Sequence, residues 1–175
     1  MRSKISFTNE SFDFLGNSSE FLNLMIHDVG SCILLLDKDM MLYAYNEPLK
    51  NIFANKEDED ILYKKCGNVI GCAYAVEEEK ECGTSSQCAF CSLRENAFNS
   101  YIDNQAIYNI RIDREFYRTT TEKVLKHLQF STRLFRFKKD KYIILIIEDI
   151  TQLVDQQQEI AEQRKLIDSF HFFEG

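Results

Sequence analysis

The sequence predicts one α/β domain, a five-stranded antiparallel sheet with short helices, flanked by N-terminal and C-terminal amphipathic helices. Two short apolar runs precede residue 46 and three alternating or apolar runs follow residue 104, which gives the strand count. A chain of 175 residues with 45% hydrophobic residues suffices for one core and is short for two domains. We expect a helical segment over 1–30, the domain over 31–151 and an exit helix over 152–175.

The first predicted elements are a helix, a strand hairpin and a second helix. Residues 17–20 read Asn-Ser-Ser-Glu, which resembles a capping box, and apolar residues follow at helical spacing. Two apolar runs within 31–45 flank a short charged turn, as in a β-hairpin. Asn46 is then a suitable N-cap, and Pro48 is tolerated in the first turn of the next helix.

The second half of the chain predicts a helix followed by three antiparallel strands. The spacing of apolar residues over 93–102 is helical. Residues 107–112 and 127–137 alternate between apolar and polar side chains, as in strands with one buried face. Residues 138–141 form a polar turn, and 142–150 are apolar on both faces, which suits a central strand.

The composition changes after Thr151 to a segment rich in Gln and Glu. Leu153, Ile160 and Ile167 recur at intervals of seven, which predicts a short amphipathic helix. This helix either pairs with a second copy of the chain or lies on its own sheet, and both arrangements are open for different parts. We expect a homodimer formed through this helix, the N-terminal Phe21 to Met25 stripe, or both.

Charge and motif content exclude several function classes. The formal net charge is −7 and residues 56–60 are mostly acidic, which argues against nucleic-acid binding. No segment approaches the roughly 18 apolar residues of a membrane span, and no signal-peptide core is present, so we expect a cytoplasmic protein. Because the chain has no nucleophile elbow, P-loop or dinucleotide-binding motif, we expect no enzyme activity.

Six cysteines are the chemically distinctive feature of the chain, and most of them fall within a cysteine-rich insert at about 66–92. In a reducing cytosol, clustered cysteines indicate metal or redox chemistry rather than a disulfide framework. Cys72, Cys82, Cys88 and Cys91 supply soft thiolates, which select zinc, Cu(I) or iron–sulfur clusters. The paired spacing of a zinc ribbon is missing, although zinc accepts four cysteines equally well. Cys32, in the opening strand, is expected in the core.

Both ends of the predicted domain resemble a PAS domain. The stretch "CILLLDKDMMLYAYNEPLKNIF" is similar to the paired opening strands of that family, and "YIILIIEDIT" to its last strand and exit. The resemblance covers about residues 31–151. It implies a sensory or dimerisation module.

The middle of the chain is similar to a PAS subgroup of bacterial sensor proteins. In "GNVIGC" and "CGTSSQCAFCSLRENAF" the G-C, C-G and C-x2-C-x-L-R elements of that subgroup recur, and iron–sulfur binding is its suspected role. The resemblance implies Cys72, Cys82, Cys88 and Cys91 as ligands, with [4Fe–4S] favoured over [2Fe–2S]. Cys66 stands where the pattern has a non-cysteine residue and is a fifth candidate. The following helix offers Arg94 and Asn96 as further donors.

These observations predict a sensor of redox state, oxygen or nitric oxide that signals through its terminal helices to a downstream signalling protein or to a continuation of the same chain. One alternative is a PAS dimerisation and interaction module stapled by zinc, without sensing chemistry. Another is a thiol–disulfide redox protein using Cys88 and Cys91, although the βαβ setting of such proteins is not predicted.

Overall fold

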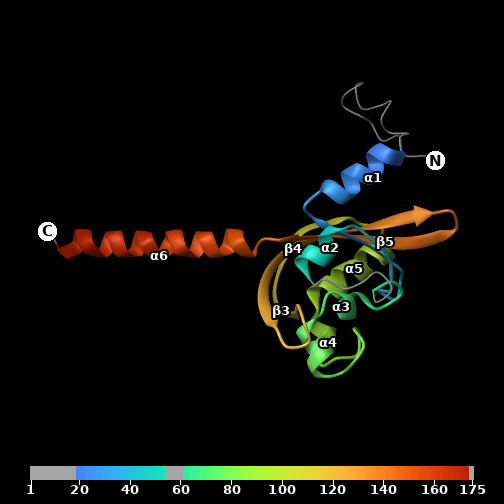
Figure 1. Ribbon diagram of the computed structural model, residues 1–175, viewed down its shortest axis with the longest axis horizontal. Helices are drawn as coiled ribbons and strands as arrows, with labels where there is room; N and C mark the ends of the chain where they lie inside the picture. Colours follow the sequence, from blue (N-terminus) through green and yellow to red (C-terminus); the bar gives the residue numbers. More distant parts are fainter. Residues whose placement is uncertain (1–18, 54–60, 174–175) are drawn as a thin grey trace.

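The computed structural model describes residues 19–53 and 61–173, and its centre is a five-stranded antiparallel sheet (Figure 1). The strand order β2-β1-β5-β4-β3 makes β5 the middle strand, as its apolar character on both faces predicts. The predicted fold class is therefore confirmed. The strands are β1 (Cys32–Leu36), β2 (Leu42–Tyr45), β3 (Ile107–Tyr117), β4 (Lys123–Phe137) and β5 (Asp140–Asp149).

Short helices gather on one side of the sheet, whereas the first and last helices extend away from it (Figure 1). Helices are expected near 19–28, 48–53, 93–102 and after Thr151, and all four are present. The predicted N-cap residue Asn17 lies outside the described residues. Within the described ranges, no helix has the length and apolar character needed to cross a bilayer. The helices are α1 (Ser19–Asp28), α2 (Pro48–Ile52), α3 (Cys66–Val69), α4 (Ala73–Glu77), the 3₁₀ turn η3 (Cys88–Phe90), α5 (Ser92–Asp103) and α6 (Thr151–Phe173).

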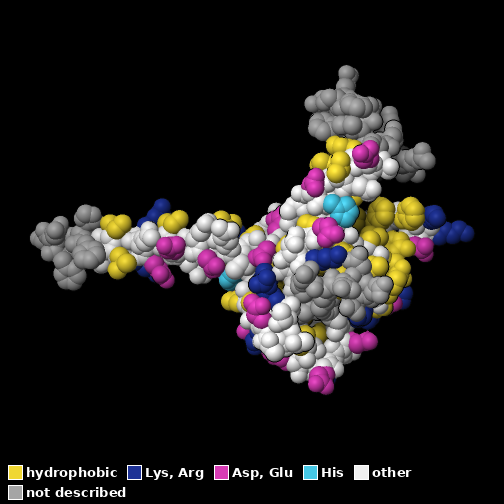
Figure 2. All heavy atoms as spheres, viewed as in Figure 1, with side chains coloured by type: hydrophobic (Ala, Val, Ile, Leu, Met, Phe, Trp, Pro, Cys, Tyr) yellow, Lys and Arg dark blue, Asp and Glu magenta, His cyan; other side chains and the backbone are white. Residues whose placement is uncertain are grey.

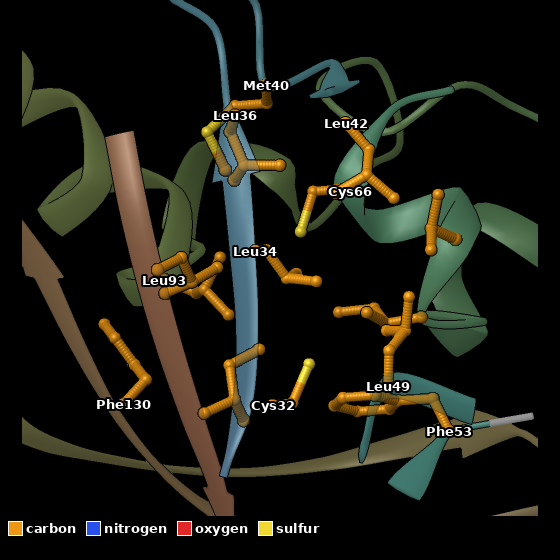
Figure 3. Close-up of a cluster of buried hydrophobic side chains, with 14 of the residues drawn as sticks. Cys32, Leu34, Leu36, Met40, Leu42, Leu49, Phe53, Cys66, Leu93 and Phe130 are labelled. Atoms are coloured by element: carbon orange, nitrogen blue, oxygen red, sulfur yellow. The ribbon is translucent and has the colours of Figure 1, made fainter. Parts of the chain in front are cut away.

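The core lies between the sheet and the short helices. Leu34 of β1 pairs with Leu145 of β5, which pairs in turn with Thr132 of β4, so their side chains share the inner face. Leu49 and Phe53 approach this face from the α2 region (Figure 3). Cys32 is fully buried, as predicted, and burial raises the pKa of its thiol to about 12.

The last hairpin differs from the sequence prediction. The turn contains Lys138 and Lys139 alone, and β5 begins at Asp140 rather than after residue 141. Lys138 adopts a φ of 54°, which allows a tighter reversal than a four-residue polar turn. Strand β3 also ends later than predicted, at Tyr117, and β4 begins earlier, at Lys123. The added residues are mostly charged, and their side chains can face solvent while their backbones still pair along the ladder.

Asn46 does not cap α2 through its side chain, contrary to the prediction. Its amide is fully buried and instead accepts a hydrogen bond from the Ile33 backbone (2.7 Å). The same amide donates to the carbonyls of Ile26 (2.8 Å) and Ser31 (2.9 Å). Burial decides this arrangement, since a buried amide must satisfy both its oxygen and its nitrogen.

The cysteine-rich insert connects the two edge strands of the sheet. At the β2 edge, the Leu42 N–H donates to the Lys64 carbonyl (2.9 Å), and the Cys66 N–H donates to the Met40 carbonyl (2.8 Å). At the opposite edge, the Tyr117 N–H of β3 donates to the Gly71 carbonyl (2.7 Å). The insert is therefore held at both margins of the sheet.

Candidate functional site

A single pocket between the insert and β3 is lined by five of the six cysteines. These are the four predicted ligands and Cys66, whereas Cys32 does not line the pocket. The cavity is about 30 Å³, which is room for a water molecule or two. Within residues 19–53 and 61–173, no three Cys, His, Asp or Glu side chains converge on one metal position. The fold thus brings the thiols around one pocket without closing a coordination shell.

Four of the five cysteines of this pocket stand at or near the beginnings of helical elements. Cys66 is the first residue of α3, Cys72 precedes α4, Cys88 opens η3, and Cys91 precedes α5. All four of these residues line the same pocket. The twelve-residue α5 also directs its positive dipole end toward Cys91, which favours negative charge there.

Close backbone contacts place Cys82 in this pocket. A Cβ added to Gly67 would lie 2.6 Å from the Cys82 sulfur, so the sulfur occupies space that only glycine leaves free. The Asn68 side-chain oxygen accepts a hydrogen bond from the Cys82 N–H (2.8 Å), and its amide donates to the Lys80 carbonyl (3.2 Å). Helix α3 therefore fixes the loop that carries Cys82.

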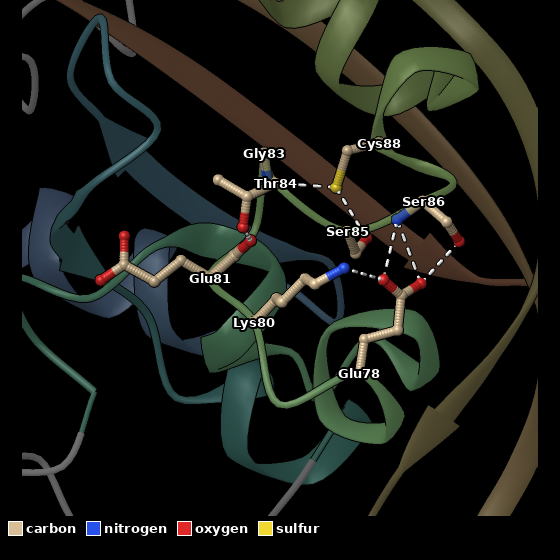
Figure 4. A network of polar contacts seen from close by, with 8 residues as sticks. All are labelled: Glu78, Lys80, Glu81, Gly83, Thr84, Ser85, Ser86 and Cys88. Atoms are coloured by element: carbon tan, nitrogen blue, oxygen red, sulfur yellow. Dashed lines mark hydrogen bonds and ion pairs between the residues drawn. The ribbon is translucent and has the colours of Figure 1, made fainter.

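Cys88 lies in a polar setting beside Gly83 and Ser85 (Figure 4). The Gly83 N–H donates to its sulfur (3.1 Å), and the Ser85 hydroxyl lies 2.9 Å from it. Burial raises the pKa of Cys88, but the hydrogen bonds from Ser85 and Gly83 outweigh it and lower the pKa overall. Burial raises the pKa of Cys66 and of Cys82. Ionised sulfur is thus most favoured at Cys88 among these three.

The loop around Cys88 is tied to α4 by Glu78 (Figure 4). The Glu78 carboxylate accepts hydrogen bonds from the Ser86 hydroxyl (2.6 Å) and backbone N–H (3.0 Å), and it pairs with Lys80 (2.9 Å). The hydrogen bonds from Ser86, followed by that from Lys80, lower the pKa of Glu78 to about 2. The carboxylate therefore stays ionised at neutral pH and holds the loop in place.

Two arginines face the thiols. The Arg114 Nη1 of β3 lies 3.3 Å from the Cys91 sulfur and 4.0 Å from the Cys72 sulfur. The Arg94 guanidinium stacks over the Phe98 ring at 4.7 Å and lines the pocket, and its buried Nη1 has no hydrogen-bond partner among the described residues. These cations make the pocket favourable for negatively charged sulfur.

The neighbouring donors differ in part from the sequence prediction. Arg94 lines the pocket as expected, but Asn96 does not, because its side chain donates to the Ser92 carbonyl of its own helix (2.7 Å). Arg114 is not among the residues predicted from the sequence. The sequence feature that could have indicated Arg114 is its position in the strand. Its side chain lies on the inner face of β3, between Ile112 and Phe116, where the alternation predicts an apolar residue.

The chemistry of the pocket fits a thiolate-bound metal or cluster. Soft sulfur ligands, hydrogen-bond donors to sulfur and two nearby guanidinium groups suit an anionic metal–thiolate centre. The unpartnered Arg94 nitrogen is a buried donor that such a centre would supply with an acceptor. The four predicted cysteines are available as ligands, and Cys66, only 1% exposed, faces the same pocket.

Comparison with known proteins identifies the fold. No protein-family model and no curated protein sequence matches this chain. Among solved structures, the PAS domain of a Colwellia psychrerythraea protein matches with a TM-score of 0.51 and 8% identity, covering 80% of this chain and 99% of that one. The PAS domain of Bordetella pertussis BvgS matches with a TM-score of 0.50 and 16% identity, covering 83% of this chain and 96% of that one.

A longer protein, an RNA-binding light-oxygen-voltage receptor, matches over 98% of this chain with a TM-score of 0.53 and 14% identity. This chain covers 42% of that receptor. At these identities the likeness concerns the fold alone, and the fold is that of a PAS domain.

Proposed function

We propose that this PAS-fold chain is a sensory module that binds an iron–sulfur cluster through Cys72, Cys82, Cys88 and Cys91, with [4Fe–4S] favoured over [2Fe–2S]. The observation that carries the proposal is the gathering of these thiols and two guanidinium groups at one pocket. When bound, the cluster would supply reversible electron uptake and reactivity toward oxygen or nitric oxide. We assign no catalytic residue.

The residues of the pocket have distinct parts in this proposal. Cys88 is held as an acceptor of hydrogen bonds by Gly83 and Ser85, which orients its sulfur before a metal arrives. Cys91 is oriented by Arg114 of β3. The Cys82 and Cys72 sulfurs come from loops held by the Asn68 side chain of α3 and by the Tyr117 backbone of β3, so loading would draw these loops together.

Signal output is proposed to pass along the sheet to α6. The insert is bound to β3 at Tyr117, and β3 pairs with β4 along its length. In β4, the His127 carbonyl accepts a hydrogen bond from the Ile150 N–H (2.9 Å), and the His127 N–H donates to the Thr151 hydroxyl (3.0 Å). These bonds fix the start of α6, so a shift of the insert has a bonded route to the helix.

The proposed organisation assigns 31–151 to the sensory domain, about 66–92 to the cluster-binding insert and 152–175 to an output helix, in a cytoplasmic homodimer that contacts a downstream signalling protein. Hydrophobic side chains are exposed along α1 and α6 (Figure 2). Leu153 and Ile160 of α6 are 47% and 51% exposed. A periodic apolar stripe exposed to this degree is typical of a helix that pairs with another chain.

The test is anaerobic reconstitution of the whole chain followed by iron, sulfide and zinc analysis and visible absorption. Single Cys→Ser variants at the four proposed ligands are expected to lose most iron and visible absorbance, because each thiolate completes one coordination shell. Cys32→Ser serves as the matched control, since that thiol is buried outside the pocket and should retain the cluster.

Each other outcome supports a named alternative. If Cys66→Ser loses the cluster and Cys72→Ser keeps it, Cys66 is the ligand in place of Cys72. A colourless protein that holds zinc and no iron would replace the sensor with a zinc-stapled interaction module. Turnover of a disulfide substrate that survives metal removal would identify a thiol–disulfide redox protein instead.

A further inference from the structure

We infer that Arg114 is a positioning residue for the cluster, whose charge stabilises the reduced state and so raises the reduction potential of the site. The inference rests on the proposed function and adds to it a determinant of the sensing threshold. It concerns a residue of β3, far in sequence from the insert that carries the cysteines.

The position of Arg114 is unusual for a charged side chain. Residues of β3 alternate between the two faces of the sheet, and Arg114 points inward together with Ile112 and Phe116, which is only 1% exposed. Its neighbours Asp113 and Glu115 are exposed on the other face. A guanidinium on the inner face is desolvated in part, which is unfavourable unless a negative group compensates it.

The contacts of Arg114 identify the compensating group as sulfur. Its Nη1 approaches the Cys91 and Cys72 sulfurs at 3.3 Å and 4.0 Å, and its guanidinium lies over the Tyr74 ring at 5.4 Å. Across residues 19–53 and 61–173, no carboxylate forms an ion pair with it. Neutral thiols are weak acceptors, whereas thiolates bound to a cluster carry the negative charge that this cation requires.

This geometry has an electrostatic consequence for the cluster. One-electron reduction adds a negative charge to the centre, and a cation beside two of its sulfur ligands attracts the reduced form more strongly than the oxidised form. Net charge and hydrogen bonds to the sulfurs are known determinants of cluster potential. Arg94 lies at the same pocket and adds to the effect, but its Nη1 contacts no sulfur within hydrogen-bond range.

The experiment compares Arg114→Gln and Arg114→Lys with wild type after anaerobic reconstitution. Iron and sulfide content is measured first, and the midpoint potential is then titrated by visible absorbance. Arg114→Gln is expected to retain iron and to shift the reduced-to-oxidised ratio at a given potential by about tenfold toward the oxidised form, which is about 59 mV for a one-electron couple. Arg114→Lys keeps the charge and should lie closer to wild type.

The matched control is Arg111→Gln, because Arg111 is an exposed residue of the outer face of the same strand. It should leave the potential unchanged. A loaded Arg114→Gln protein with the wild-type midpoint would overturn the inference and leave the proposed cluster in place. A wild-type protein that binds no iron would overturn the proposed function itself.

If Arg114→Gln does not hold iron, Arg114→Lys decides the question. A charge role requires that the lysine variant load and titrate near wild type. A folded lysine variant, judged by its circular dichroism spectrum, that loads but titrates far from wild type would overturn the inference, and so would one that fails to load.

Discussion

Replacing Gly71 by alanine is expected to detach the cysteine-rich insert from β3. Gly71 has a φ of +71°, and an added Cβ would lie 2.4 Å from the Tyr117 carbonyl oxygen, a backbone atom that cannot rotate away. The left-handed conformation costs a non-glycine residue about 1–2 kcal/mol. Loss of the 2.7 Å hydrogen bond between the Tyr117 N–H and the Gly71 carbonyl costs about another 1 kcal/mol.

The sum for Gly71→Ala is about 2–4 kcal/mol once the displaced contacts are included, a large share of the roughly 5–15 kcal/mol of a typical domain. For a chain of this size the melting temperature should fall by about 4–16 °C. Thermal unfolding followed by circular dichroism measures this directly. Because Cys72 follows Gly71 in the chain, proteolysis within the insert should also precede loss of the sheet.

Gly30→Ala is the control for this prediction, since no atom lies within 4 Å of its added Cβ and its φ is not positive. It should melt within about 1 °C of wild type, by the same conversion of free energy to melting temperature. A Gly71→Ala protein as stable as Gly30→Ala, with an insert equally resistant to protease, would refute the reasoning that this contact anchors the insert.

Three further perturbations have defined outcomes. Asn46→Ala removes the partner of three partly buried backbone groups and should lower the free energy of unfolding in urea by about 2–4 kcal/mol; a loss under about 1 kcal/mol contradicts this role. Burial raises the pKa of Asp149, but its hydrogen bond to Lys126 and those to its other partners outweigh burial and lower the pKa below 3.8. Its stabilisation is therefore present above that value and lost as pH falls through the folded-state pKa. Asp149→Asn should weaken the acid dependence of urea unfolding, and parallel curves for the two proteins would count against it. Leu153→Glu combined with Ile160→Glu should give monomers on a sizing column, whereas an unchanged dimer places the interface elsewhere.

Local patterns in the sequence determine most of the secondary structure. The two-residue alternation of β3 and β4, the doubly apolar β5 and the helical spacing in α5 are visible within a few residues, because side-chain direction repeats over that distance. The four-cysteine pattern is equally local. The sequence therefore predicts the sheet, its middle strand and the thiolate chemistry.

The tertiary structure decides which distant groups meet. Arg114 reaches Cys91 and Cys72 because β3 lies at the sheet edge to which the insert is bonded, and no periodicity within either segment encodes that pairing. Asn46 becomes a buried connector for the same reason: its partners come from other segments. Sequence patterns report the face on which a side chain lies, whereas strand order and register determine what lies opposite that face.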